Sequence, residues 1–169
     1  ITQVTEELDR FISKCAILNY KNNDSLKTMK WDWCLKEGGM WHATYDDKGE
    51  IISLSGVHPF KDGYRALFRG AQISLRPTKG LNRNMMQSWG MYDQMPLQIK
   101  YANDKPIYIT TNINNDASGK MNRIHNSCKI MAKNGMVEYI GDEEIFNTLQ
   151  SIWKLNVDTY FEIRKRNED

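Results

Sequence analysis

The sequence predicts an α+β domain in which helices flank a mixed, mostly antiparallel central sheet. Three observations predict it: apolar residues recur at helical spacing near the N-terminus, the hydrophobic period changes to two from Met40, and helix-like and strand-like segments alternate in the second half. A chain of 169 residues is long enough for one complete domain. We therefore expect residues 1–169 to form a single domain, with its core over about 24–155.

The first elements are two helices. An apolar stripe at helical spacing predicts a helix over residues 4–18. A second helix begins at Asp24 or Ser25, either of which can cap it, and ends at Gly38 and Gly39.

Three antiparallel strands follow the helices. Residues 40–46 alternate between apolar and polar side chains, and residues 50–58 are rich in β-branched side chains, with a DDKG turn between them. Pro59 and residues 61–63 form the next turn, and residues 64–75 make the third strand. The three strands are expected to form a meander.

The second half begins with a helix and a central strand. Pro77 stops the third strand, Gly80 opens a helix, and that helix is expected to end near Pro96. Residues 106–112 are short, apolar and β-branched, which is typical of a strand buried on both faces.

A helix and a hairpin complete the predicted order. Apolar residues at helical spacing predict a helix over 121–131. Residues 136–140 and 144–154 are expected to pair as a final hairpin that turns at 141–142. The charged segment after Tyr160 is expected to be a solvated end.

Composition narrows the classes of function. The hydrophobic fraction of 40% and charged fraction of 26% are ordinary for a globular protein. A net charge of +2 gives no general attraction to nucleic acid. No apolar run approaches the roughly 20 residues that a membrane helix needs, and the N-terminal segment lacks the apolar core of a signal peptide. We expect a cytoplasmic protein without a membrane partner.

The cysteines and histidines are widely spaced along the chain: they are Cys15, Cys34, Cys128, His42, His58 and His125. An odd number of cysteines without a C-x-x-C pair predicts reduced, buried thiols rather than disulfides or a zinc site. No two histidines stand at i, i+4 on a predicted helix, so we expect no metal site.

Five basic residues gather around the turn after the third strand: Arg65, Arg69, Arg76, Lys79 and Arg83. A strand that feeds a helix through a short basic turn aims backbone amide hydrogens and positive charge at one point. This arrangement suits a phosphate-bearing ligand, either coenzyme A (CoA) or a nucleic acid. The other interpretation is a solvated rim whose charges pair with acidic residues elsewhere.

In element order and in this turn, residues 24–155 resemble the GCN5-related N-acetyltransferase (GNAT) superfamily. The resemblance implies a GNAT-like sheet with two splayed neighbouring strands, here 64–75 and 106–112, and acetyl-CoA or another acyl-CoA in the opening between them. The family's pyrophosphate turn has the pattern Q/R-x-x-G-x-G/A, and the matching stretch here is RPTKGLNRNMM. Gly80 takes the first glycine position, whereas Asn82 stands at the second and Pro77 at that of Gln or Arg.

The resemblance also assigns the residues that would bind the cofactor. Backbone amides of residues 79–82 would cradle the pyrophosphate, two arginines would add charge, and backbone groups of 73–75 would hold the pantetheine. The residues implied are Ile73, Leu75, Arg76, Lys79, Gly80, Leu81, Asn82 and Arg83.

The family's catalytic pattern is matched in part. Asn112 corresponds to the family's Asn after the central strand, but the helical Tyr that protonates the departing thiolate has no counterpart, since Ile130 and Met131 occupy that stretch. The candidate catalytic residues are Asn112, Ser118 and His125, with His125 as a substitute for the missing acid. The alternatives are a helix-capping role for Ser118 and simple surface exposure for His125, which faces away from the apolar stripe.

These observations predict an acyl-CoA-dependent N-acyltransferase, most simply an acetyltransferase, that transfers the acyl group directly to an amine. The acceptor would be a small molecule or a peptide. Two alternatives remain open at this point: a GNAT-fold protein with lost or altered chemistry that binds or modifies nucleic acid through the same arginines, and a non-catalytic interaction module.

Overall fold

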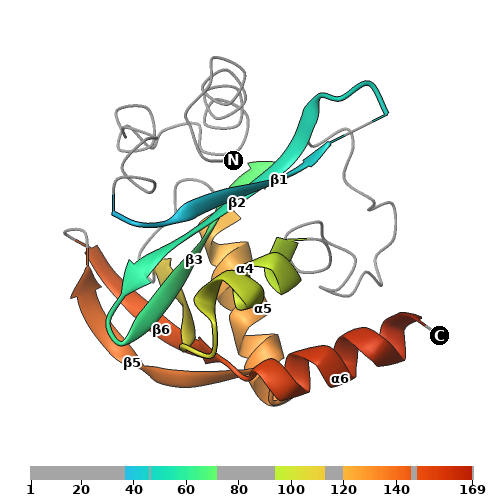
Figure 1. The fold of residues 1–169 in the computed structure, drawn as a ribbon. Coiled ribbons are helices and arrows are strands. Elements are labelled where there is room, and N and C mark those ends of the chain that lie inside the picture. Colours follow the sequence, from blue (N-terminus) through green and yellow to red (C-terminus); the bar gives the residue numbers. More distant parts are fainter. Residues whose placement is uncertain (1–36, 46, 72–93, 113–119, 146–147, 169) are drawn as a thin grey trace.

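The computed structural model describes residues 37–45, 47–71, 94–112, 120–145 and 148–168 (Figure 1). The strands in these ranges form one six-stranded sheet in the order β1-β2-β3-β4-β6-β5, which is antiparallel except for the β3–β4 pair. The elements are β1 (Met40–Tyr45), β2 (Ile51–Phe60), β3 (Gly63–Ala71), α4 (Met95–Ala102), β4 (Ile107–Asn112), α5 (Lys120–Lys133), β5 (Val137–Ile145), β6 (Thr148–Leu155) and α6 (Val157–Glu168). The predicted α+β class and the mostly antiparallel sheet are therefore confirmed. The helix predicted over 4–18 lies outside the described residues, as does the second predicted helix up to residue 36.

The predicted meander is present as β1, β2 and β3, but β2 runs further than expected. Pro59 was expected in the turn, yet it belongs to β2 and pairs with Tyr64. The last pair between β1 and β2 joins Met40 to Val57, so Pro59 lies beyond the end of β1 and its missing N–H costs no ladder hydrogen bond there. The turn is consequently short, and Lys61 adopts a positive φ of 50° in it.

A helix begins close to Pro96, where the predicted helix was expected to end. The described helix α4 begins at Met95, carries Pro96 in its first turn and ends at Ala102. Proline is tolerated in the first turn because the amide hydrogens there have no partner within the helix. Asn103, with φ 50° and ψ 64°, terminates the helix in the left-handed conformation. The part of the predicted helix before residue 94 lies outside the described residues.

Two buried glutamines fix α4 against β2. The Gln94 Oε1 atom accepts a hydrogen bond of 2.6 Å from Ser55 Oγ, and Gln94 Nε2 donates to the Ser53 carbonyl at 3.1 Å. One turn later, Gln98 Nε2 donates to Ser55 Oγ at 2.7 Å. Both glutamines and both serines are buried, so these hydrogen bonds set the position of the helix, although Gln98 Oε1 has no hydrogen-bond partner among the described residues.

The core lies between α4, α5 and one face of the sheet (Figure 1). The strand predicted as central is β4, whose Ile107 and Ile109 are buried with Met95 of α4 and with Cys128 and Met131 of α5. Cys128 is fully buried, and burial raises its thiol pKa to about 12, which confirms the inert thiol expected there. The other two cysteines lie outside the described residues.

The final hairpin differs from the prediction in the position of its turn. Strand β5 continues through residues 141–142, and β6 begins at Thr148. Gly141 has a φ of 150°, and the β5–β6 register shifts between Tyr139 and Gly141, so the glycine marks a bulge within the strand rather than a turn. The residues between the strands, 146–147, lie outside the described ranges.

The segment expected to be a solvated tail is the helix α6. Asn156 caps its start, because its Oδ1 accepts a hydrogen bond of 3.1 Å from the Thr159 amide. Tyr160 is fully buried in the core cluster, which anchors the helix to the sheet. None of the helices in the described ranges has the length and apolar character needed to cross a bilayer.

Candidate functional site

Strands β3 and β4 pair at one end only. Their parallel ladder consists of Tyr64 with Ile107 and Arg65 with Tyr108, although β3 continues to Ala71 and β4 to Asn112. We call the paired end of these two strands, residues 64–65 and 107–108, the closed end. Beyond the closed end the two strands form no ladder with each other, and we call this unpaired stretch of β3 and β4, toward their carboxyl ends, the gap.

The closed end is built by close backbone contact. The Tyr64 amide donates a hydrogen bond of 2.8 Å to the Pro106 carbonyl. A Cβ atom added to the neighbouring Gly63 would lie 2.0 Å from that same carbonyl oxygen. Only glycine therefore allows the β2–β3 turn to approach β4 this closely.

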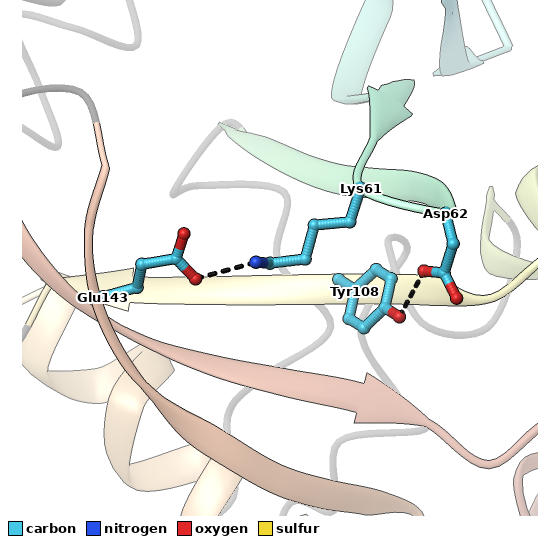
Figure 2. A network of polar contacts seen from close by, with 4 residues as sticks. All are labelled: Lys61, Asp62, Tyr108 and Glu143. Atoms are coloured by element: carbon cyan, nitrogen blue, oxygen red, sulfur yellow. Dashed lines mark hydrogen bonds and ion pairs between the residues drawn. The ribbon is translucent and has the colours of Figure 1, made fainter.

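Two side chains of the same turn reach across the sheet, as Figure 2 shows. Lys61 Nζ lies 2.7 Å from Glu143 Oε2 on β5, and Tyr108 on β4 donates a hydrogen bond of 2.5 Å to Asp62 Oδ1. The Lys61 and Glu143 side chains are 37% and 50% exposed, so this ion pair contributes little to stability. The hydrogen bond raises the pKa of Tyr108 to about 12 and lowers the pKa of the Asp62 carboxyl.

These shifts predict a stability that depends on pH through Tyr108. Its pKa is higher in the folded chain than the ordinary value of 10.0, so its contribution is complete below pH 10 and is lost as the pH rises toward about 12. We expect the urea midpoint of the wild type to fall over this range, and to fall less in Tyr108→Phe. An equally steep loss in both proteins would assign the alkaline sensitivity to other groups.

Arg65 extends from the last ladder pair to the next part of β4. Its Nε donates a hydrogen bond of 2.7 Å to Thr110 Oγ1, and its Nη1 lies 3.3 Å from His58 Nε2. The Nδ1 atom of His58 lies 2.9 Å from the Pro59 carbonyl, which can only accept, so Nδ1 carries the proton and Nε2 accepts from Arg65. His58 is therefore a neutral acceptor beside a permanently charged guanidinium.

His125 is joined to the carboxyl end of β4. Trp153 Nε1 donates a hydrogen bond of 2.9 Å to Thr111 Oγ1, and Thr111 Oγ1 lies 2.8 Å from His125 Nδ1. Because the Thr111 hydroxyl accepts a hydrogen bond from the indole, we assign its single proton to a hydrogen bond donated to His125 Nδ1. This assignment makes His125 neutral, with its remaining proton on Nε2.

The surroundings of His125 favour the neutral form. Burial lowers its pKa, the Lys129 ammonium lowers it further, and the Asp142 carboxylate opposes both. Asp142 is itself held by hydrogen bonds from Tyr139 at 2.6 Å and from Ser151 at 2.8 Å, which lower its pKa. The result is a neutral imidazole close to a fixed carboxylate.

The two candidate catalytic residues that the structure describes lie at the carboxyl end of β4. Asn112 is the last residue of that strand, and His125 contacts the residue just before it. The expected surface exposure of His125 is wrong, because the side chain is half-buried against Thr111 and Trp153. Ser118 and the predicted cofactor residues lie outside the described ranges; the latter are Ile73, Leu75, Arg76, Lys79, Gly80, Leu81, Asn82 and Arg83.

Sequence reasoning missed most partners of these residues. It did not connect His58 with Arg65, although a two-residue turn at 61–62 places them directly opposite each other, and that register was a usable signal. It also treated 106–112 as an apolar strand and gave no role to Thr110 and Thr111 at its polar end. The contact between Thr111 and His125 arises from tertiary packing of α5 and has no signal in sequence spacing.

The third histidine, His42, stands apart from the gap. It lies on β1, and burial lowers its pKa to about 4, so it is neutral at physiological pH. Within the described ranges, no group of three His, Cys, Asp or Glu side chains is placed to hold a metal ion.

Comparisons with known proteins give matches in structure but not in sequence. No family model matches the chain, and no curated protein sequence matches it significantly. An acyl-CoA N-acyltransferase from Pseudomonas aeruginosa is similar in structure, with a TM-score of 0.58 at 8% identity over 91% of this chain and 93% of that one.

Two further solved structures agree with this similarity. Escherichia coli ElaA gives a TM-score of 0.55 at 9% identity, over 92% of this chain and 94% of its own. A Bordetella pertussis protein assigned to the GnaT acetyltransferase family gives a TM-score of 0.53 at 11% identity, over 92% of this chain and 93% of its own. At such identities the likeness concerns the fold. The chain therefore has the fold of the GCN5-related N-acetyltransferase superfamily.

Proposed function

We propose that this protein is an acyl-CoA-dependent N-acyltransferase, with acetyl-CoA as the simplest donor. The observation that carries the proposal is the gap between β3 and β4, which pair at only two positions before they separate. In a closed sheet the backbone groups of both strands would be used in the ladder. Here the groups that face the gap beyond the closed end form no β3–β4 ladder, and a pantetheine arm carries amide groups that could bind them.

The proposed cofactor residues are those of the turn after β3. Backbone amides of residues 79–82 would hold the pyrophosphate, Arg76 and Arg83 would add positive charge, and backbone groups of residues 73–75 would hold the pantetheine. Acetyl-CoA would supply the acyl group as a thioester, which an amine takes directly with release of the CoA thiol. The amine belongs to a small molecule or a peptide.

Two of the proposed catalytic residues, Asn112 and His125, belong to or adjoin the carboxyl end of β4, and the third, Ser118, lies outside the described residues. His125 takes the place of the missing tyrosine by donating a hydrogen bond from Nε2–H to the departing sulfur, a role that a neutral imidazole can fill. The proton that the attacking amine loses ends on that sulfur, which leaves as the CoA thiol. Asn112 orients the acyl group, and Ser118 is a further polar candidate at the entry to α5. No activated nucleophile is apparent among these side chains, so the proposal needs no covalent enzyme intermediate.

Thermal unfolding with and without acetyl-CoA tests this function. At a hundredfold excess over Kd, a ligand specific for the folded state stabilises it by about 2.7 kcal/mol, or roughly 5–10 °C for a chain of this size. We expect such a shift with acetyl-CoA and with CoA, and an increase in Kd of about tenfold or more in Gly80→Trp, because the indole blocks close backbone approach to the pyrophosphate.

The matched control is Gly49→Trp in the β1–β2 turn, where an added Cβ meets no atom within 4 Å. This variant is expected to bind CoA as the wild type does. An unchanged melting temperature with both acetyl-CoA and CoA would refute the proposed function.

A further inference from the structure

The closed end of the gap is bridged by a side chain where the backbone ladder has already stopped. The last ladder pair joins Arg65 to Tyr108, and the Arg65 side chain continues to Thr110, two residues further along β4. Tyr108 and Thr110 share one face of the strand, so the guanidinium lies across that face at the vertex of the gap. It joins the two strands at the point where they begin to separate.

The guanidinium is held in this position from both sides. The His58 ring is 4% exposed and is fixed by its own hydrogen bond to the Pro59 carbonyl, so its Nε2 presents a stationary acceptor to Arg65. Thr110 is 8% exposed and sits between β3 and β6 in the sheet. A charged group with fixed partners on two strands is a rigid boundary rather than an adaptable surface.

We propose that the Arg65–Thr110 bridge is the floor of the acyl pocket and restricts the enzyme to short acyl groups. This inference rests on the proposed function. In sequence the predicted phosphate turn comes after the carboxyl end of β3, and this end, about 20 Å from Arg65, is where β3 forms no ladder with β4. A pantetheine arm entering from that side and lying along β3 directs its acyl end toward the closed end and therefore toward Arg65.

The chemistry of the bridge explains the restriction. A methyl group can approach a guanidinium that keeps its hydrogen bonds, but each further methylene must displace the bridge or lie against a charged group and desolvate it. In a pocket that fits its ligand, one added methylene changes affinity by about tenfold or more. Removing the Arg65–Thr110 bridge should create room at the floor of the acyl pocket and so restore affinity for longer acyl groups.

The experiment measures Kd of the full chain for acetyl-, butyryl- and hexanoyl-CoA by calorimetry. The wild type is expected to bind acetyl-CoA best. In Arg65→Ala, the ratio of the hexanoyl-CoA Kd to the acetyl-CoA Kd should fall by about tenfold or more. Thr110→Val, which keeps the side-chain shape but removes the acceptor of the bridge, should lower the same ratio by a smaller factor.

The second variant protects the test from loss of folding, because Arg65→Ala removes the Arg65 contacts with both His58 and Thr110, whereas Thr110→Val removes only the Thr110 hydroxyl from the bridge. If all proteins bind CoA thioesters with the wild-type preference for chain length, the inference is wrong and the proposed function stands. If the wild type binds no CoA thioester, the proposed function and this inference both fail.

Discussion

Alanine at position 63 is expected to destabilise the protein by about 3 kcal/mol or more, the upper range for overpacking. Its methyl carbon would have to occupy a point 2.0 Å from the Pro106 carbonyl oxygen, well inside any allowed contact. The obstructing atom belongs to the backbone, and it also accepts the Tyr64 amide hydrogen bond that joins β3 to β4. Relief therefore requires the closed end to separate. Urea unfolding of Gly63→Ala against the wild type measures the loss.

The control for this prediction is Gly49→Ala. Gly49 has a φ of 80° and nothing within 4 Å of an added Cβ, so its replacement costs only the backbone strain of about 1–2 kcal/mol. Gly63 is the opposite case: its φ is not positive, so alanine there would add no backbone strain, but its Cβ would clash with a neighbouring backbone atom. Equal costs for the two variants would show that the close approach of the turn to β4 is not a feature of the folded protein.

Much of the fold could be predicted because local patterns and tertiary structure agree. The period-two segment from Met40, the short turn before Gly63 and the β-branched strand 106–112 became β1 to β4. Residues 107–111 are buried as the pattern of that strand requires, whereas in β1 only Trp41 is buried and Tyr45 is exposed. The helix predicted from 121 likewise matches α5.

The errors in the fold came from residues with two common roles. Gly141 followed by Asp142 is a typical turn dipeptide, but here the glycine forms a bulge and the strand continues. Pro96 was expected to lie near the end of a helix, but proline is also common in the first turn of a helix, and that is its position in α4. The charged α6 packs on the core through Val157, Tyr160 and Ile163, and their i, i+3, i+6 spacing was a usable signal that the many charged residues around them obscured.

Less of the candidate site was accessible from sequence. The basic turn and the place of Asn112 follow from local order, but the gap is defined by where the β3–β4 ladder stops, which no local pattern encodes. His125 was a catalytic candidate, and the alternative of surface exposure rested on its place off the apolar stripe of its helix. Its true contact is with a threonine on a strand and, beyond it, an indole, and a polar chain of this kind forms only when three separate elements meet.

That polar chain gives the second large expected effect, in Thr111→Val. Valine leaves the Trp153 Nε1–H without its acceptor in a side chain that is only 4% exposed, and an unsatisfied buried donor costs about 1–3 kcal/mol. Valine also removes the donor to His125 Nδ1, so the imidazole is no longer held as the Nε2–H tautomer. The proposed transfer to an amine should then slow by about tenfold or more, as expected when a positioned donor is lost.

The matched control is Thr111→Ser, which keeps the hydroxyl in place and should preserve both effects of the threonine. Nitrogen-15 NMR of the histidine rings separates the structural claim from the catalytic one. In the wild type and in Thr111→Ser, His125 should give the shifts of a neutral Nε2–H imidazole that titrates below the ordinary pKa, since burial disfavours its cation. In Thr111→Val the two ring nitrogens of His125 should approach averaged shifts.

Identical ring shifts in all three proteins would show that Thr111 does not set the tautomer. A normal tautomer change without any loss of transfer rate would remove His125 from the proposed chemistry and leave the chain of hydrogen bonds a structural role only.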